Sequence, residues 1–246
     1  MNVIRNFNNT NESNIRIVDA AYDYRLLLSR GYGQRYALDM VASRYSLNRE
    51  KKLLLYRCVH SMQYIVNVIP KIACTLEPQG ALIIDFYNIL LTVLCMLENC
   101  DVYLCDDCIV RDLRGYKSRS QDYTYLLKAY DLILNAISQL KPLKIIVVAD
   151  KNFSHSAIQI ERFNKYIVER GLTGYSILSP TPDRDSIEIS RSEHAIVASS
   201  DSVVVENSYK VFPLTTVITN QLNKEFTINF ADLFGTPCST CYEHAM

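Results

Sequence analysis

The chain has 246 residues, of which 49% are apolar and 21% are charged, and its 26 basic and 26 acidic residues give a formal net charge of zero. This composition is typical of a globular protein and excludes a disordered chain. The polar, Asn-rich start over residues 1–14 is unlike a secretory signal. The most apolar stretch, residues 81–97, is too short and too polar to span a bilayer. We therefore expect a soluble cytoplasmic protein that does not enter a membrane.

The charges are unevenly distributed along the chain. Residues 1–78 contain 11 Lys and Arg against 6 Asp and Glu, whereas residues 79–246 contain 15 against 20. Basic surface can hold polyanions by releasing their counterions, and clustered carboxylates can hold divalent cations. A chance distribution of solvated charges explains the asymmetry equally well.

In chain order, the first part of the sequence predicts a small helical domain over residues 15–77, after a tail over residues 1–14. Apolar residues recur at helical spacing, and Gly31, Gly33 and the Ser46–Asn48 stretch break the pattern as helix ends do. Pro70 is expected to bend or break the last helix. The predicted helices span residues 17–30, 34–44, 49–62 and 64–76.

The second part predicts an α/β domain over residues 79–234, followed by a tail over 235–246. Its boundary is the turn-forming stretch at residues 78–80. Short apolar runs then alternate with amphipathic stretches, which is typical of a mainly parallel sheet flanked by helices. The predicted strands span residues 81–85, 102–105, 143–149, 175–178, 195–199 and 211–214, and the helices 88–97, 123–140 and 155–170.

Acidic residues stand at the ends of these strands. Asp85 and Asp150 end two of them, Asp201 follows a third, and Asp106 and Asp107 end a fourth. Ligands bind outside the carboxyl ends of the strands in open α/β sheets. Carboxylates gathered there would repel one another unless a divalent cation joined them. The alternative is that each Asp merely forms a turn or caps a helix.

Two Cys-x-x-Cys pairs, Cys105 with Cys108 and Cys238 with Cys241, raise the question of a structural zinc site. The pairs are far apart in sequence and neither lies in a Gly-rich ribbon, so we do not expect zinc at these four residues. Free thiols are the default in a reducing cytosol, whereas a disulfide fits a hyperthermophilic source.

The stretch Ile84-Asp85-Phe86-Tyr87-Asn88 resembles the first-strand Asp-x-x-Asn motif of PIN-like and NYN-like nuclease domains. The stretch Val197 to Ser202 resembles their later strand that ends in Ser/Thr-x-Asp. The whole chain also resembles an uncharacterised archaeal family that joins an N-terminal helical domain of unknown function to a PIN-like domain. Segments over residues 24–32, 54–61, 103–107 and 110–115 carry that likeness.

This resemblance implies a Mg²⁺- or Mn²⁺-dependent ribonuclease. Its catalytic residues would be Asp85, Asp150, Asp185 and Asp201. The metal ligands would be Asp85, Asp150, Asp201 and one of the loop acids Asp183 and Asp185, between which the sequence does not choose. Asn88 would orient Asp85 or contact substrate. The remaining candidate substrate contacts are Asp106, Asp107, Arg111, Arg114, Lys151 and His155. For Arg111 and Arg114, the alternative to phosphate binding is an ion-pair network with the nearby Asp residues. For His155, the alternative to substrate binding is a position in a capping loop.

The basic helical domain is expected to help bind nucleic acid, with RNA as the partner. Tyrosines are interleaved with its basic residues, which suits stacking on unpaired bases. The candidates are Arg25, Arg30, Arg35, Arg44, Arg49, Lys51, Lys52 and Arg57, with Tyr22, Tyr24, Tyr32, Tyr36 and Tyr45. A non-catalytic binding module of the same fold and a phosphohydrolase remain the alternatives, and the oligomeric state stays open.

Overall fold

The computed structural model describes residues 12–75, 80–114 and 122–238, and the chain divides into two compact units. Unit 1 draws on the ranges Met1–Pro70, Asp101–Leu113 and Glu225–Ser239. Unit 2 draws on Lys71–Cys100, Arg114–Lys224 and Thr240–Met246. These units divide the chain differently from the sequence-based ranges, because two later segments fold with the N-terminal helices.

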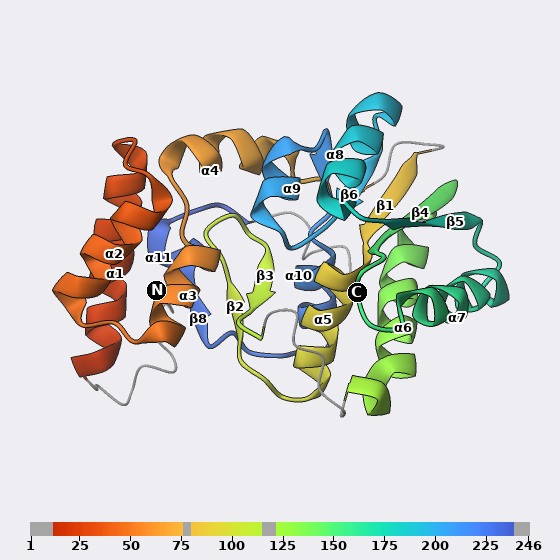
Figure 1. Cartoon of the computed structure of the whole chain (residues 1–246), viewed down its shortest axis with the longest axis horizontal. Coiled ribbons are helices and arrows are strands. Elements are labelled where there is room, and N and C mark those ends of the chain that lie inside the picture. The colour runs from red at the N-terminus through yellow and green to blue at the C-terminus, as the bar shows by residue number, and fades with distance from the viewer. Residues whose placement is uncertain (1–11, 76–79, 115–121, 239–246) are drawn as a thin grey trace. The chain divides into compact units, whose positions relative to one another are not determined.

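Four helices begin unit 1 (Figure 1), and they are α1 (Glu12–Ser29), α2 (Gln34–Tyr45), α3 (Arg49–Cys58) and α4 (Met62–Val68). The side chain of Asn48 accepts a hydrogen bond from the Lys51 amide at the start of α3, as expected of a cap in the break before it. The predicted third helix is too long, because Val59 is extended and Ser61 caps a new helix through the Tyr64 amide. A short 3-10 helix, Ile69–Lys71, follows α4.

The later segments of unit 1 supply a small sheet in the order β3-β2-β8. Strand β2 (Val102–Leu104) pairs antiparallel with β3 (Val110–Asp112) and parallel with β8 (Ile228–Asn229), which leads into α11 (Phe230–Phe234). Tyr103, Cys105 and Phe230 share one buried apolar cluster with residues of α1, α2 and α3. The prediction that β2 belongs to the main sheet is therefore wrong.

Unit 2 contains a five-stranded parallel sheet in the order β5-β4-β1-β6-β7. This confirms an α/β fold with a mainly parallel sheet. The strands are β1 (Ala81–Asp85), β4 (Lys144–Asp150), β5 (Gly174–Ser179), β6 (Ile196–Ala198) and β7 (Lys210–Val211). The predicted last strand extends too far, since Pro213 and Leu214 already start a helix.

Helices cover both faces of this sheet. One group packs together around α5 (Phe86–Leu97), and its other members are α6 (Asp122–Gln139), α7 (Ser156–Glu169) and α10 (Leu214–Gln221). The other group comprises α8 (Pro182–Glu193) and α9 (Ser202–Asn207). Phe86, Tyr130 and Phe163 form an aromatic cluster from three helices of the first group, with ring centroids 4.9–6.1 Å apart.

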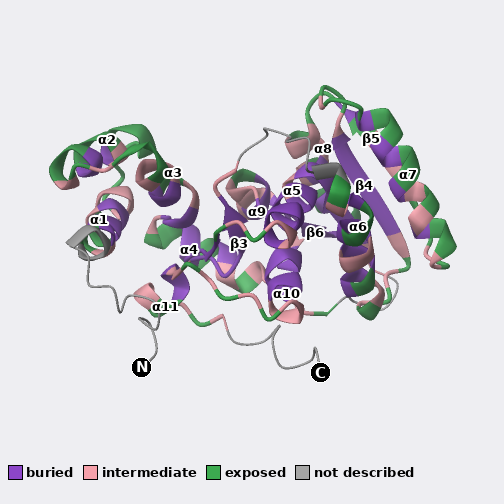
Figure 2. Ribbon diagram, turned by 90° about the horizontal axis from the view of Figure 1, so that it is seen from below, coloured by how far each residue is buried: buried purple, intermediate pink, exposed green. Residues whose placement is uncertain are grey.

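Burial follows the sequence pattern. Figure 2 shows β4 buried over most of its length, while α7 presents both buried and exposed residues. Helix α5 is apolar on nearly every side because other elements surround it. None of the described helices combines the length and apolar character that crossing a bilayer requires.

A disulfide joins Cys108 to Cys238 within unit 1, with their Cα atoms 5.4 Å apart. The default expectation of free thiols is therefore wrong for these two residues. Cys105 is buried as a thiol, and Cys241 lies outside the described residues. Because two of the four sulfurs are bonded to each other, the paired motifs cannot supply four thiolates to one zinc ion.

The disulfide gives a stability prediction. Changing Cys108 and Cys238 together to Ser should lower the free energy of unfolding by about 2–4 kcal/mol, because the cross-link restricts a long loop of the unfolded chain. Urea denaturation of the variant and of the disulfide-bonded wild type measures this change. Cys100→Ser is the control, since Cys100 is an unbonded, partly exposed thiol. An unchanged denaturation midpoint in the double variant would contradict the prediction.

Candidate functional site

The sheet of unit 2 has a switch point between β1 and β6. From β1 the chain moves to β4 and β5 on one side, and then crosses to β6 and β7 on the other. Connections that leave neighbouring strands in opposite directions open a crevice at their carboxyl ends. Asp85 ends β1 at this point, and Ser199 directly follows β6.

The side chain of Asp85 is held by two hydrogen bonds. Its Oδ2 accepts one from Asn88 Nδ2 at 2.7 Å and one from Ser199 Oγ at 2.6 Å. The Ser199 hydroxyl oxygen also accepts from the Asp201 amide at 3.0 Å. Asn88 thus contacts Asp85, as one of its two expected roles requires, and Ser199 links the ends of both strands.

Asp85 carries an unusual protonation equilibrium. The residue is only 3% exposed, and burial raises the pKa of its carboxyl to about 7, although the hydrogen bonds from Ser199 and Asn88 lower it. The negative charges of Asp183 and Asp201 raise it further. Asp85 is therefore poised to exchange a proton near neutral pH.

Asp183 and Asp201 act on Asp85 by charge, and a further carboxylate, that of Asp150, acts on Asp183. Burial raises the pKa of Asp183, and the charges of Asp201 and Asp150 add to the shift. Asp201 Oδ1 accepts hydrogen bonds from the backbone amides of Val203 and Val204. Asp150 Oδ1 accepts a hydrogen bond from the backbone amide of Asn152. Within the described residues, no Lys or Arg forms an ion pair with any of the four Asp side chains.

These uncompensated carboxylates have the chemistry of a site for a hard cation. Mg²⁺ prefers one or two carboxylates together with waters. Over residues 12–75, 80–114 and 122–238, no three of the four acids bring oxygens within 4.8 Å of one another. A cation at this edge could therefore be held directly by at most two of them, with water reaching the others.

The two acids expected in a loop lie instead in the first turn of α8. Pro182 stands at the start of this helix, where its fixed φ and missing N–H are tolerated. Asp185 accepts a weak hydrogen bond from Thr181 Oγ1 at 3.5 Å. Asp183 is instead coupled to Asp85, Asp150 and Asp201 by charge, which separates the two candidates.

Two basic candidates lie beyond Asp150. Lys151 and His155 are both exposed. His155 occupies the position before α7 with a left-handed φ of 60°, and its side chain makes no cap hydrogen bond. Phe153, between them, stacks on Tyr87 with ring centroids 3.8 Å apart, which ties this loop to the start of α5.

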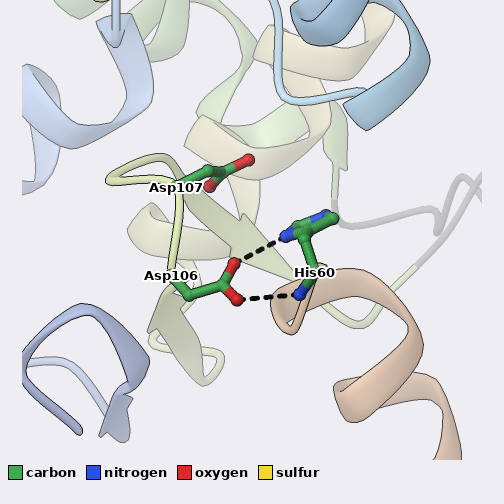
Figure 3. Close-up of side chains that lie close together, drawn as sticks. All are labelled: His60, Asp106 and Asp107. Carbon is green, nitrogen blue, oxygen red and sulfur yellow. Dashed lines mark hydrogen bonds and ion pairs between the residues drawn. The ribbon is translucent and has the colours of Figure 1, made fainter. Parts of the chain in front are cut away.

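A second polar group is buried in unit 1 and consists of His60, Asp106 and Asp107 (Figure 3). Asp106 accepts from the His60 amide at 2.7 Å and lies 2.6 Å from His60 Nδ1. Asp107 accepts from both terminal nitrogens of Arg111, at 2.7 and 2.6 Å, and from Tyr64 Oη at 3.0 Å. All four carboxylate oxygens thus have protein partners.

This second group is a compensated ion-pair network. Burial alone would raise the pKa of Asp107, but the charges of Arg111 and His60 outweigh it and hold that pKa below its ordinary value. Its ligand types and spacing are compatible with a metal, yet a cation would have to displace existing bonds beside the Arg111 guanidinium. We therefore assign the network to structure.

Three residues that were expected to contact substrate belong to this network, and a fourth forms a different ion pair. Asp106, Asp107 and Arg111 are at most 1% exposed, so the expected roles in substrate binding are wrong for them. They belong to unit 1, whereas the acids at the sheet edge belong to unit 2. Arg114 pairs with Glu98. The alternative of ion pairing with a nearby Asp is confirmed for Arg111, whereas the partner of Arg114 is a Glu.

Sequence reasoning also missed features of both units. Ser199 has no role of its own in the sequence-based prediction. The Ser-x-Asp pattern at the end of a strand is the signal that could have identified its role. Two of the expected nucleic-acid contacts, Tyr24 and Arg25, are buried. No local pattern marks them, because their burial depends on packing against distant segments.

Comparisons with other proteins follow the two-part organisation of the sequence. A family model described as a domain of unknown function, DUF5616, matches residues 76–217, and one described as a protein of unknown function, DUF434, matches residues 16–71. An uncharacterized protein of Methanocaldococcus jannaschii is 28% identical over 192 residues, which cover 78% of this chain and 89% of that protein. No solved structure matches the chain.

The raised pKa of Asp85 gives a pH prediction. The folded protein binds this proton more tightly than the unfolded chain does, so the group favours folding at low pH. That contribution is lost as the pH rises from about 4 to about 7. Urea denaturation should show Asp85→Asn gaining stability relative to wild type between pH 5 and pH 8, by on the order of a few kcal/mol. A difference that stays constant with pH would contradict the assignment.

The buried network of unit 1 gives a different prediction. Asp107→Asn should cost about 3–5 kcal/mol of stability, because Arg111 keeps its buried charge and loses its partner. Adding Arg111→Met should recover part of this loss, since it removes the unpaired charge. Denaturation of both single variants and the double variant tests the coupling, and strictly additive losses would argue against it.

Proposed function

The chain belongs to the DUF5616 family, and for this member we propose the activity of a metal-dependent nuclease that cleaves RNA. The observation that carries the proposal is the buried Asp85 carboxyl, which ends β1 at the switch point and faces further acids without a cation partner. Burying a carboxyl group beside further acids costs free energy, and groups held at such a cost are typical of functional sites.

Each residue around Asp85 has a role in this proposal. Asp85 and Asp183 bind the divalent cation, because burial and mutual repulsion make them the two acids most in need of one. Asn88 and Ser199 position Asp85 through their hydrogen bonds. Asp150 and Asp201 act through water, since each already uses one oxygen on backbone amides. A bound Mg²⁺ or Mn²⁺ would supply activated water and stabilise the leaving oxygen in phosphodiester hydrolysis.

The PIN-like character of unit 2 is part of the same proposal. The two motifs that resemble PIN-like domains, Asp85-x-x-Asn88 and Ser199-x-Asp201, come from the neighbouring strands β1 and β6. Their side chains are joined by hydrogen bonds on Asp85. This arrangement supports a shared catalytic role for the motifs.

Exposed side chains of unit 1 support RNA as the substrate. Arg30 and Arg35 are exposed around the turn from α1 to α2. Tyr32 and Tyr36, in the same stretch, are 52% and 77% exposed. Alternating cations and aromatic rings suit the phosphates and unstacked bases of a single strand.

The test is cleavage of end-labelled single-stranded RNA with Mn²⁺, Mg²⁺ or EDTA. Wild type should cleave only with metal. Asp85→Asn and Asp183→Asn should each lower the rate roughly a hundredfold or more, because the site loses a carboxylate ligand. Asp185→Asn is the matched control on the same helical turn and should keep most of the activity.

Other outcomes separate the competing functions. Full activity in Asp85→Asn, or equal losses in Asp183→Asn and Asp185→Asn, would contradict the proposed site. Metal-independent RNA binding without cleavage by folded wild type would favour a non-catalytic binding module. Hydrolysis of small phosphate esters in preference to RNA would indicate a phosphohydrolase.

A further inference from the structure

Unit 1 contains a pocket of about 740 Å³ that the nuclease proposal does not use. It lies between α1, α4 and the chain that continues from α11. Its volume falls within the range of about 300–1,000 Å³ that is usual for small-molecule sites. Its walls are mostly apolar, and Leu26, Ile65, Val66 and Phe234 are among the lining residues.

The rim of this pocket exposes large apolar side chains. Leu26 is 54% exposed, Met62 48% and Val66 68%. They come from two helices and line one hollow, which distinguishes them from scattered surface residues.

Arg25 brings an isolated positive charge to the pocket. It lines the pocket and is only 8% exposed. Its guanidinium carbon lies 4.2 Å from the centroid of the Phe234 ring, and its Nη2 contacts the Met62 sulfur at 3.0 Å. Its buried Nε has no hydrogen-bond partner, and the described residues provide no ion pair for it.

The surroundings of Arg25 do not compensate this charge. A thioether sulfur is a weak acceptor. Asp106 attracts Arg25 electrostatically, but both Asp106 oxygens are already engaged by His60. A buried cation without a close counterion is costly unless something pairs with it.

We propose that this pocket binds a small organic monocarboxylate, with its acid group on Arg25 and its apolar body along Leu26 and Val66. Nε and Nη2 share the edge of a guanidinium that can donate two parallel hydrogen bonds to a carboxylate. The flexible Met62 side chain is half exposed and can move from Nη2 to admit an oxygen. The single negative charge of a carboxylate matches the single positive charge of the guanidinium. A doubly charged phosphate ester would leave an unbalanced negative charge near the Asp106 carboxylate.

The test compares ligands that share a chain and differ in the head group. Decanoate, decanol and decylamine are titrated into the full-length protein by calorimetry. Wild type should bind decanoate roughly ten- to a hundredfold more tightly than decanol, with decylamine weakest. Arg25→Met should abolish the preference for decanoate over decanol.

Two further variants keep the test decisive if Arg25→Met does not fold. Leu26→Glu adds a negative charge at the rim and should weaken decanoate binding at least tenfold. Met40→Glu is the matched control, because Met40 is also 54% exposed and lies outside the pocket lining. It should leave binding unchanged.

Three results would overturn the proposal. The first is equal affinity of wild type for decanoate and decanol, and the second is decanoate binding that Leu26→Glu leaves intact. The third is a wild-type dimer that binds no decanoate and that Leu26→Glu dissociates, as seen by sedimentation, because the pocket face would then be a contact between two copies. None of these results depends on nuclease activity, so the two proposals fail separately.

Discussion

The burial of one carboxyl group, that of Asp85, sets the chemistry of unit 2. The apolar residues of β1 pair on both sides, with β4 and with β6, which forces the last residue of the strand into the interior at the switch point. Ser199 and Asn88 then become necessary, because a buried carboxyl without hydrogen bonds is costly. The acids at the start of α8 and α9 add negative charge to a position that already favours a proton.

The two polar clusters of the protein show opposite solutions to burial. In unit 1, the two oxygens of Asp107 accept hydrogen bonds from the two terminal nitrogens of Arg111. Each oxygen of Asp106 contacts a nitrogen of His60. In unit 2, the described residues give Asp85 only neutral donors and acidic neighbours. A network that satisfies itself stabilises a fold, whereas a cluster that lacks counter-charge favours an external cation. This contrast supports the proposal of a functional site at the sheet edge and a structural role for the His60 group.

Much of the fold could be predicted from local pattern. The continuous apolar runs before Asp85 and Asp150 predicted parallel strands correctly, because strands buried on both faces need such runs. The segment with Asp106 and Asp107 carries a similar signal, yet it belongs to another sheet. Strand β8, with only two residues, is too short for any periodicity to identify. The joining of distant segments in unit 1 depends on tertiary contacts that no local window contains.

The candidate site was predictable to a similar extent. Acids at strand ends and the Asp-x-x-Asn spacing identified Asp85, Asn88 and Asp201, because topology brings strand ends together. The choice between Asp183 and Asp185 required the helix, since side chains two positions apart on a helical turn point in different directions. The isolation of Arg25 could not be foreseen, because it depends on Phe234 and Met62 from distant parts of the chain.

The most direct test of the central claim is the titration of Asp85 itself. The ¹³C chemical shift of its carboxyl carbon, assigned through Asp85→Asn, is followed against pH with and without Mg²⁺. Our account predicts a pKa near 7 without metal and a clear fall when Mg²⁺ is present, because the cation stabilises the carboxylate. An ordinary carboxyl pKa of about 4 without metal, or a pKa that Mg²⁺ leaves unchanged, would contradict it.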